Sequence, residues 1–316
     1  MSSRWFHAIG LTTVILLAGP ALVAGQAPPA RAPGTAPAAP YTAPRTADGQ
    51  PDIQGTWDSR GAIAGTSIEC GYDSNAGVGH HENFEPPLAG QSQRPLDAAI
   101  KAYTGPSNPC GADGGHDYGS TYYGLALPMQ PWARARKDEI FNKLYKSKAG
   151  PSSVQELDTV ARCLPGGQNR HGRGVRYILQ PPGQVVIIDE LFFRHRVIVL
   201  DGRPRTPDTV RLWSGDSRGH WEGQTLVVES SNFNDKTWLD SAATFHSDAL
   251  RTTERFTIVD AGTFKYEITI DDPKVFTKPF TLSNASVRVK KGDEMLESEC
   301  LEGIRLENYG IGQSGK

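Results

Sequence analysis

The feature that most constrains the fold of this chain is a series of strand-like segments that follows Cys163 and runs almost to the C-terminus. Each segment is rich in β-branched and aromatic residues and is bounded by turn residues, a pattern typical of β-strands. The segments are residues 174–180, 184–191, 194–200, 209–214, 225–230, 250–259, 263–270, 281–290 and 294–300. About nine or ten successive strands with short connections favour an all-β, antiparallel up-and-down barrel, with a β-sandwich as the alternative.

Two details of these segments favour antiparallel pairing. Residues 264–270 alternate between apolar and polar side chains, as expected for a strand with one buried face and one wet face. Turn-forming sequences stand at three joints: Pro-Gly at 182–183, Asp-Ala-Gly at 260–262 and Lys-Gly-Asp at 291–293. Such sequences connect consecutive antiparallel strands as hairpins.

The N-terminal part of the chain is organised differently. Residues 1–25 carry Arg4, then an apolar run and small residues, which is the order of a secretory signal peptide. Residues 26–50 are rich in Pro and Ala and predict a disordered linker. The sequence then predicts a single β-barrel domain over 51–312, with 59–160 as an insertion of loops and helices.

Two helices are expected within this insertion. The first is a short one at 95–103. The second, at 131–146, is better supported, because Pro131 suits a first helical position and apolar residues recur along one stripe. The remainder of the insertion is dense in Gly, Pro, Ser and Asn and is expected to form loops.

The signal peptide and the charge of the chain together limit where the protein is expected to be located and which partners it is expected to bind. Signal cleavage would leave a periplasmic or secreted protein without an integral membrane span. The chain has 33 Lys and Arg residues against 35 Asp and Glu residues, so no summed positive field favours nucleic acid. A neutral small-molecule ligand, either hydrophobic or sugar-like, is the expected partner. The oligomeric state is left open.

Four cysteines follow the signal peptide: Cys70, Cys110, Cys163 and Cys300. An even number of cysteines in an exported protein indicates disulfides, and four cysteines allow three pairings. None of them stands in a Cys-x-x-Cys pair, which argues against a metal site. The preferred pairing is Cys70 with Cys110 and Cys163 with Cys300.

The sequence Gly55-Thr56-Trp57 stands at the start of the expected domain. A Gly-x-Trp sequence on a first strand resembles the lipocalin and wider calycin barrels. In those barrels the Trp closes one end and a late Arg commonly packs on it. The resemblance therefore implies a calycin-like barrel with Trp57 buried at one end, and Arg288 and Arg305 are the candidates for the late Arg.

A second resemblance covers residues 160–301. It rests on stretches at 162–165, 200–204, 213–229, 233–240 and 271–280. These stretches look like a widespread, uncharacterised family of exported bacterial proteins. That resemblance implies a shared fold and export, and it assigns no particular reaction.

Glu190 and Arg196 are the first candidate site residues, because both stand in an apolar double strand where most neighbours should be buried. A buried charge needs a partner, so a mutual ion pair inside the barrel is one interpretation. In the other, Glu190 is a general acid or base and Arg196 contacts the ligand. His195 alternates with Arg196 and is expected to face outward.

A long loop between the strands that end near residue 230 and begin near 250 carries the next candidates. Asp240 and His246 would supply an oriented imidazole for catalysis near neutral pH. Asn234, Trp238 and Asp248 are candidate ligand contacts, since long loops in compact β folds often form sites. Side chains of the Asp and Asn type also satisfy loop backbone, which is the structural alternative.

Trp213 and Asp216 complete the candidate ligand contacts. They stand in a Gly-rich segment that has two interpretations. In the structural one the segment is a turn with a packed Trp, and in the functional one it is an aromatic platform for a sugar or apolar ring. The His- and Glu-containing sequence at 79–85 and His116 lack metal-ligand spacing. No metal and no cofactor are therefore expected.

The sequence thus predicts an exported barrel that binds a neutral hydrophobic or sugar-like small molecule. If it is an enzyme, its groups suit cofactor-independent acid–base chemistry, as in a hydrolase, lyase, hydratase or isomerase. The alternative is a non-catalytic periplasmic binding or carrier protein.

Overall fold

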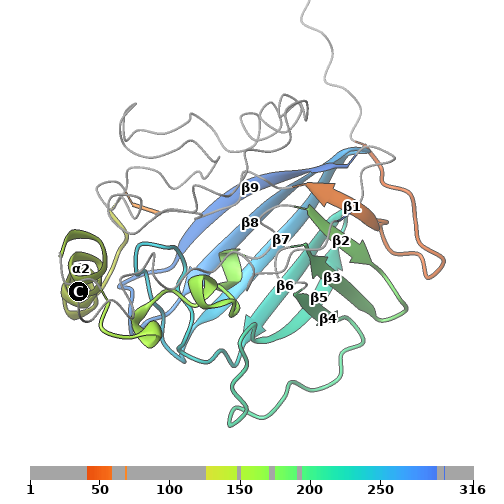
Figure 1. Cartoon of the computed structure of the whole chain (residues 1–316). Helices are drawn as coiled ribbons and strands as arrows, with labels where there is room; N and C mark the ends of the chain where they lie inside the picture. The colour runs from red at the N-terminus through yellow and green to blue at the C-terminus, as the bar shows by residue number, and fades with distance from the viewer. Residues whose placement is uncertain are drawn as a thin grey trace, which may run out of the picture. The chain divides into compact units, whose positions relative to one another are not determined.

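The structure, a computed structural model, describes residues 41–58, 68–69, 126–147, 151–170, 175–190, 194–289 and 295, which all belong to one compact unit, Tyr41–Lys316. Its elements in chain order are β1 Gly55–Asp58, α2 Pro131–Phe141, η1 Asn142–Lys146, η2 Val154–Glu156, η3 Val160–Arg162, η4 Gln168–Arg170, β2 Val175–Leu179, β3 Gln184–Asp189, β4 His195–Val199, β5 Asp216–Glu222, β6 Thr225–Ser231, β7 Arg251–Asp260, β8 Thr263–Asp271 and β9 Phe280–Arg288. Strands β1 to β9 form a closed barrel in sequence order (Figure 1).

The closed barrel confirms the predicted all-β, calycin-like fold. Neighbouring strands pair antiparallel throughout, with one exception: β4 and β5 pair parallel through Ile198↔Ser217 and Val199↔Arg218. A closed ring with an odd number of strands cannot alternate direction at every joint, so one parallel pair is required. The connection at 200–215 provides it, because it returns the chain to the end of the barrel from which β4 starts.

Most strands lie where the sequence predicts them, and one does not. The expected strand at 209–214 is wrong, because this segment contributes an isolated bridge between Leu212 and Phe233. The strand at this point is β5, which begins at Asp216, in sequence expected to form a turn. The expected strand at 294–300 and the turn at 291–293 lie outside the described residues.

One end of the barrel interior is closed by Trp57, which is 1% exposed. Its indole N–H donates to the carbonyl of Ile53 at 2.8 Å, and its ring packs edge-on against the Phe264 ring, with 4.6 Å between the ring centres. The Arg288 guanidinium lies 4.3 Å from the centre of the Trp57 ring, and its Nη1 donates to the carbonyl of Gln54. The prediction of a buried Trp beneath a late Arg is confirmed for Arg288, while Arg305 lies outside the described residues.

Residues 41–50, which the sequence analysis assigns to the linker, contact the barrel. Ala43 is buried, and its N–H donates to Oε1 of Gln224, while Nε2 of Gln224 donates to the carbonyl of Tyr41. Arg45 and Pro51 form an antiparallel bridge. Small and extended Pro/Ala-rich sequence can lie flat against a barrel wall, because it brings little side-chain bulk and few backbone donors.

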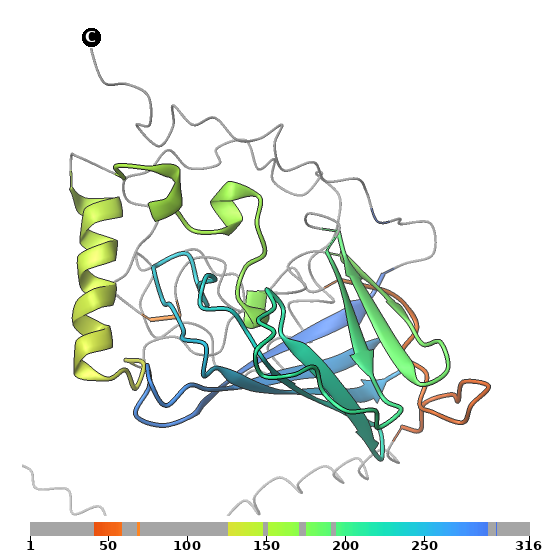
Figure 2. The same ribbon diagram turned by 90° about the horizontal axis from the view of Figure 1, so that it is seen from below.

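Helix α2 begins at Pro131 as predicted, and a π-helical turn, η1, continues it to Lys146. Lys137 is fully buried on its inner face and donates to Glu69 at 2.6 Å, and Arg134 also pairs with Glu69. Figure 2 shows the helix alongside the loops at one end of the barrel. The expected helix at 95–103 lies outside the described residues.

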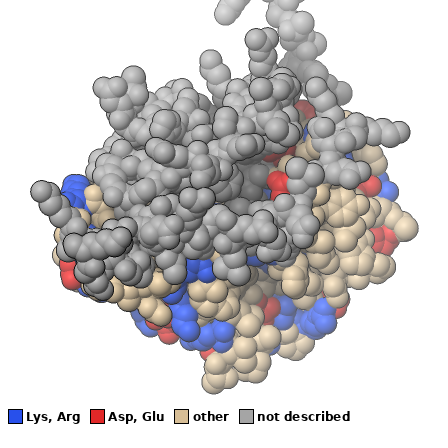
Figure 3. All heavy atoms as spheres, viewed as in Figure 1, with Lys and Arg blue, Asp and Glu red and all other residues tan. Residues whose placement is uncertain are grey.

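Cys163 is disulfide-bonded. The other cysteines, Cys70, Cys110 and Cys300, lie outside the described residues, so the predicted pairing stays a prediction. None of the helices in the described part of the chain is long and apolar enough to cross a membrane. On the face shown in Figure 3, basic and acidic side chains are interspersed over the described surface.

Candidate functional site

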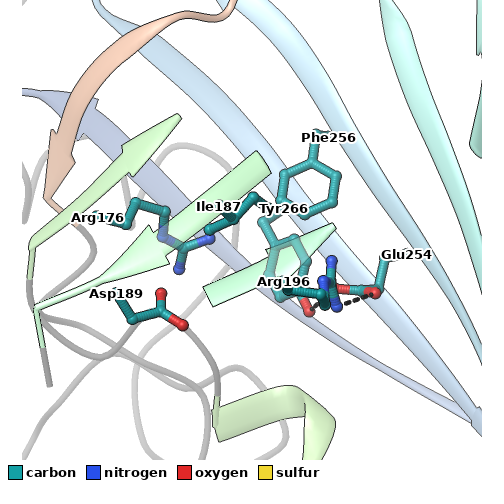
Figure 4. Close-up of a pocket in the computed structure, with 7 residues that line it drawn as sticks. All are labelled: Arg176, Ile187, Asp189, Arg196, Glu254, Phe256 and Tyr266. Atoms are coloured by element: carbon teal, nitrogen blue, oxygen red, sulfur yellow. Dashed lines mark hydrogen bonds and ion pairs between the residues drawn. The ribbon is translucent and has the colours of Figure 1, made fainter. Parts of the chain in front are cut away.

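A small cavity lies inside the barrel, and one of its lining residues, Arg176, is the direct cross-strand neighbour of Trp57. The free space that the cavity encloses has a volume of about 10 Å³, about the room that one water molecule needs, and is far below the roughly 300–1,000 Å³ of pockets that hold drug-sized ligands. The side chains that line it are Arg176, Ile187, Asp189, Arg196, Glu254, Phe256 and Tyr266 (Figure 4).

The period of the strands explains why these side chains meet. Successive residues of a strand point to opposite faces, so every second residue faces the barrel interior. On β7 the buried series is Thr252, Glu254, Phe256 and Ile258, while the residues between them are partly exposed. Glu254 thus stands in an inward position between an apolar and a hydroxyl side chain.

Glu254 is the centre of a buried hydrogen-bond network. Arg196 on β4 contacts both carboxylate oxygens of Glu254, with Nη1 to Oε2 at 2.8 Å and Nη2 to Oε1 at 3.2 Å. The Tyr266 hydroxyl donates to Oε1 at 2.9 Å, and Nε2 of Gln168 donates to Oε2 at 3.0 Å. All four side chains are at most 6% exposed.

The environment of Tyr266 fixes its role as a donor. Burial raises the pKa of its phenol well above the usual range, and the neighbouring charge of Glu254 raises it further, with the guanidinium of Arg196 acting in the opposite sense. The hydroxyl therefore stays protonated at physiological pH and donates to the carboxylate. In this arrangement the Tyr266 hydroxyl helps to position Glu254.

Two more charges stand beside this network. Arg176 on β2 and Asp189 on β3 are direct cross-strand neighbours, and both are buried. The lining of the cavity thus holds two Arg, one Asp and one Glu, whose formal charges sum to zero. A buried ion pair is often no more stabilising than an apolar replacement of the same volume. Stability alone is therefore a weak reason for so many charges in a barrel interior.

Gln168 reaches Glu254 from outside the barrel wall. It belongs to the short turn η4, all three residues of which are buried. The turn is anchored to the long loop between β6 and β7: the N–H of Gly167 donates to the carbonyl of Trp238 at 2.9 Å, and Nδ2 of Asn169 donates to the carbonyl of Leu239 at 2.7 Å. A side chain at Gly167 would place its Cβ 2.5 Å from the Trp238 oxygen, so only glycine fits there.

Arg196 lies in the cavity, but the expected Glu190–Arg196 ion pair is wrong, because both amino groups of Arg196 bond to Glu254. Glu190 follows β3 and is half-buried, with Oε2 3.5 Å from the N–H of Val175. Alternation along β4 directs His195 outward, where it is exposed, which confirms the prediction for this residue.

The structure places Asp240 in a structural role within its loop. Its Oδ1 accepts the N–H groups of Ala242 and Thr244, at 2.9 and 3.0 Å. Its Oδ2 accepts the hydroxyl of Thr244 at 2.7 Å and the N–H of Ile68 at 3.0 Å. The fully buried carboxylate thus satisfies the backbone of its own loop, which is the structural alternative that the sequence leaves open for such side chains.

His246 is also buried in this loop and does not bond to Asp240. Its Nε2 lies 2.6 Å from the hydroxyl of Thr237, and its Nδ1 lies 2.9 Å from the carbonyl of Ser247. Because Ser247 offers only an acceptor, Nδ1 carries the proton and Nε2 accepts from Thr237. Burial lowers the pKa of His246, so the neutral ring is favoured. The two residues are therefore not brought together as an acid–base couple.

The other predicted contacts are spread over the loops that surround the barrel. Asn234 accepts the N–H of Lys236, and the partly exposed Asp248 pairs with Lys274. Trp238 bridges to Phe245, and its carbonyl holds Gly167.

Trp213 and Asp216 lie at the start of β5. The half-buried Trp213 ring faces the ammonium of Lys236 at 5.8 Å. Asp216 is buried and ties two segments together, through Arg218 at 2.7 Å and the N–H of Thr206 at 2.6 Å. Neither residue lines the cavity.

Sequence reasoning missed most of the residues that do line the cavity. Glu254, Tyr266, Arg176 and Asp189 were assigned to strands without a functional role. A signal for two of them was present: the alternation of residues 252–258 and 264–270 places Glu254 and Tyr266 on the inward face. No local signal marks Gln168, because its contact joins positions 86 residues apart.

Comparisons with known proteins add little to this geometry. No family model matches the chain, and no curated protein matches it. A crystal structure of an asparagine-to-alanine mutant of the fluorescent protein UnaG is similar, with 16% sequence identity over 42% of this chain and 86% of that chain and a TM-score of 0.23. At this TM-score the similarity carries no argument about function. Within the described residues no group of three His, Cys, Asp or Glu side chains is arranged to hold a metal ion.

Proposed function

We propose that this protein is an exported small-molecule-binding protein, whose ligand is a neutral, hydroxyl-rich molecule such as a sugar. The ligand would bind around Glu254, where side chains must move apart to admit it, because the cavity has room for about one water molecule. The observation that carries the proposal is the lining of that cavity, in which paired charges, a phenol and an aromatic ring surround one small space inside a barrel.

The charges of the lining support a neutral ligand. Because the two Arg are balanced by Asp189 and Glu254, neither an anion nor a cation gains from the summed field. Hydroxyl groups both donate and accept hydrogen bonds, so they match a wall that offers guanidinium donors and carboxylate acceptors. The Phe256 ring supplies an apolar face of the kind that packs against the C–H face of a sugar.

The aromatic packing beside the cavity argues against the hydrophobic alternative. A carrier of long apolar ligands needs a deep apolar cavity. In this barrel the Phe264 ring packs against both Trp57 and Phe256, with ring centres 4.6 and 5.8 Å apart, and each of the three is at most 1% exposed. Side chains occupy the space that an apolar chain would need.

Isothermal titration calorimetry of the mature chain tests the proposal. The probes are the neutral monosaccharides D-glucose, D-galactose, D-xylose and D-mannose, with dodecanoate as the apolar probe. We expect at least one sugar to bind and Tyr266→Phe to weaken it at least tenfold, or about 1.4 kcal/mol. The control Thr281→Val changes a hydroxyl on the outer face of β9, at an exposed position, and should leave the affinity unchanged. Binding of dodecanoate but of none of the sugars would contradict the proposal.

Export is part of the same proposal and has a separate test. It is supported by the signal-like order of residues 1–25 and is compatible with the disulfide at Cys163. N-terminal sequencing of secreted or periplasmic material should begin between Ala24 and Ala30. Recovery of the intact Met1 terminus in the membrane fraction would refute export.

A further inference from the structure

Gln168 occupies a position on Glu254 that differs from those of the other partners. Arg196 and Tyr266 belong to strands β4 and β8 and are part of the barrel wall. Gln168 belongs to the turn η4, which is not one of the barrel strands, and its side chain reaches Oε2. Three of the four hydrogen bonds to Glu254 thus come from the wall, and one comes from a turn that covers it.

The orientation of the Gln168 amide follows from chemistry. A carboxylate only accepts hydrogen bonds, so the amide nitrogen must face Glu254 and the amide oxygen must point away from it. That oxygen, Oε1, is buried and finds no donor among the described residues. A buried acceptor without a donor loses its hydrogen bond to water without a replacement, which offsets much of what the bond to Glu254 contributes.

The hydrogen bonds that hold the turn do not involve the side chain of Gln168. Gly167 and Asn169 donate to the carbonyls of Trp238 and Leu239 on the long loop, and Arg170 pairs with Asp158 at 2.8 Å. A change of the Gln168 side-chain rotamer would free Oε2 of Glu254 and leave these bonds in place.

From these contacts we infer that the Gln168 amide occupies the site where the ligand binds. The ligand displaces this amide and donates a hydrogen bond from its own O–H or N–H group to Oε2 of Glu254. This inference rests on the proposed function and names the chemistry of the ligand. A molecule of similar size without a donor would not replace the amide. Gln168 is then a competitor of the ligand, and its removal should strengthen binding.

Acetamide and acetone are matched probes for this inference. Acetamide carries the amide group of Gln168, and acetone has nearly the same shape without a donor. Their dissociation constants are measured by NMR titration of ¹⁵N-labelled protein, followed at the side-chain N–H signals of Arg196 and Gln168. In wild type, acetamide should shift both signals. In Gln168→Ala, acetamide should bind at least tenfold more tightly than in wild type, and at least tenfold more tightly than acetone.

Two further variants keep the test sharp. Thr281→Val changes an exposed hydroxyl on the outer face of β9, away from the contact with Glu254, so its affinity for acetamide should equal that of wild type. Gln168→Met has a side chain of similar size that makes no hydrogen bond to Glu254. This variant should also bind acetamide more tightly than wild type, and it serves as the test if Gln168→Ala does not fold.

Two results with the matched probes would overturn the inference. One is an equal affinity of wild type and the Gln168 variants for acetamide. The other is acetone binding as tightly as acetamide, because this would show only that the substitution opened a hole. A sugar that binds wild type and Gln168→Ala equally well would overturn this inference and leave the proposed function standing, whereas absence of sugar binding to either would refute the proposed function.

Discussion

Two parts of the barrel interior each involve an arginine, in different ways: the apolar end at Trp57, and the network around Glu254, named the charged end. At one end, the exposed Arg288 lies over the buried ring of Trp57, which packs on Phe264. At the other, the buried Arg196 pairs with the buried Glu254 and is surrounded by polar side chains. The first arrangement leaves the charge in water and buries the aromatic ring, while the second removes two charges from water.

This difference separates stability from function. Burial of a Trp beneath a solvated cation removes apolar surface from water and adds a cation–π attraction. Burial of an ion pair carries a desolvation penalty that often cancels its attraction. The Trp57 end therefore stabilises the fold, and the Glu254 end is better explained by ligand binding.

The largest expected effect breaks the pair at the charged end. Glu254→Leu leaves Arg196 buried without its carboxylate, and we expect the free energy of unfolding to fall by about 3–5 kcal/mol. Adding Arg196→Met to this variant should recover most of the loss, because no unpaired charge then remains. Urea denaturation of the single and double variants measures both values. A double variant as unstable as the single one would show that the pair itself stabilises the barrel.

The next effect concerns the apolar end. Trp57→Phe removes the indole N–H bond to the Ile53 carbonyl and leaves space beside Phe264, so we expect a loss of about 2 kcal/mol. Sugar affinity should be unchanged, because Trp57 does not line the cavity. Urea denaturation and calorimetry on the same samples check the two statements. A tenfold loss of affinity would break the proposed separation of the two ends.

A smaller effect is expected for the arginine that covers Trp57. Arg288→Met keeps an unbranched apolar stem over the ring but removes the cation and its bond to the Gln54 carbonyl. Because the guanidinium is exposed, we expect a loss of about 1 kcal/mol, measured by urea denaturation. A value above the loss for Trp57→Phe would contradict this account of the apolar end.

The smallest effect is a pH dependence from His246 in the long loop. Burial lowers its pKa in the folded state, although the Ser247 carbonyl and the charges of Asp272 and Asp235 act in the opposite direction. The unfolded chain therefore binds this proton at a higher pH than the folded chain does. The contribution of His246 to the free energy of unfolding should be fully present above about pH 6.5, and it should be lost as the pH drops toward the lowered pKa of the folded state. His246→Gln should reduce the slope of stability against pH between 7 and 5, and an unchanged slope would exclude His246 as its source.

The fold was largely predictable because its signals are local. Alternation in residues 263–270 and the Gly-x-Trp sequence at 55–57 each report a strand and its buried face from a few neighbours. Strand β5 was missed because its sequence, with Gly219 and few β-branched residues, lacks that pattern. Gly219 is required by packing, since a Cβ there would lie 2.8 Å from Ile198.

The candidate site was less predictable because its contacts are long-range. Arg196 was found from its charge in an apolar strand, but its partner Glu254 stands 58 residues away, and nothing local distinguishes it from Glu190. For Asp240 and His246 the residue types suggest catalysis, and only the structure shows that loop backbone and Thr237 take up their hydrogen bonds.

The most direct test of the account measures stability and binding together in one variant. Arg196→Met, Glu254→Leu, Tyr266→Phe and Gln168→Met combined replace the polar network with apolar side chains of similar volume. We expect an unfolding free energy equal to or above that of wild type in urea denaturation, and at least a hundredfold loss of sugar affinity in calorimetry, about 2.7 kcal/mol. Sugar binding at wild-type affinity in this variant would contradict the claim that the charged end is the ligand site.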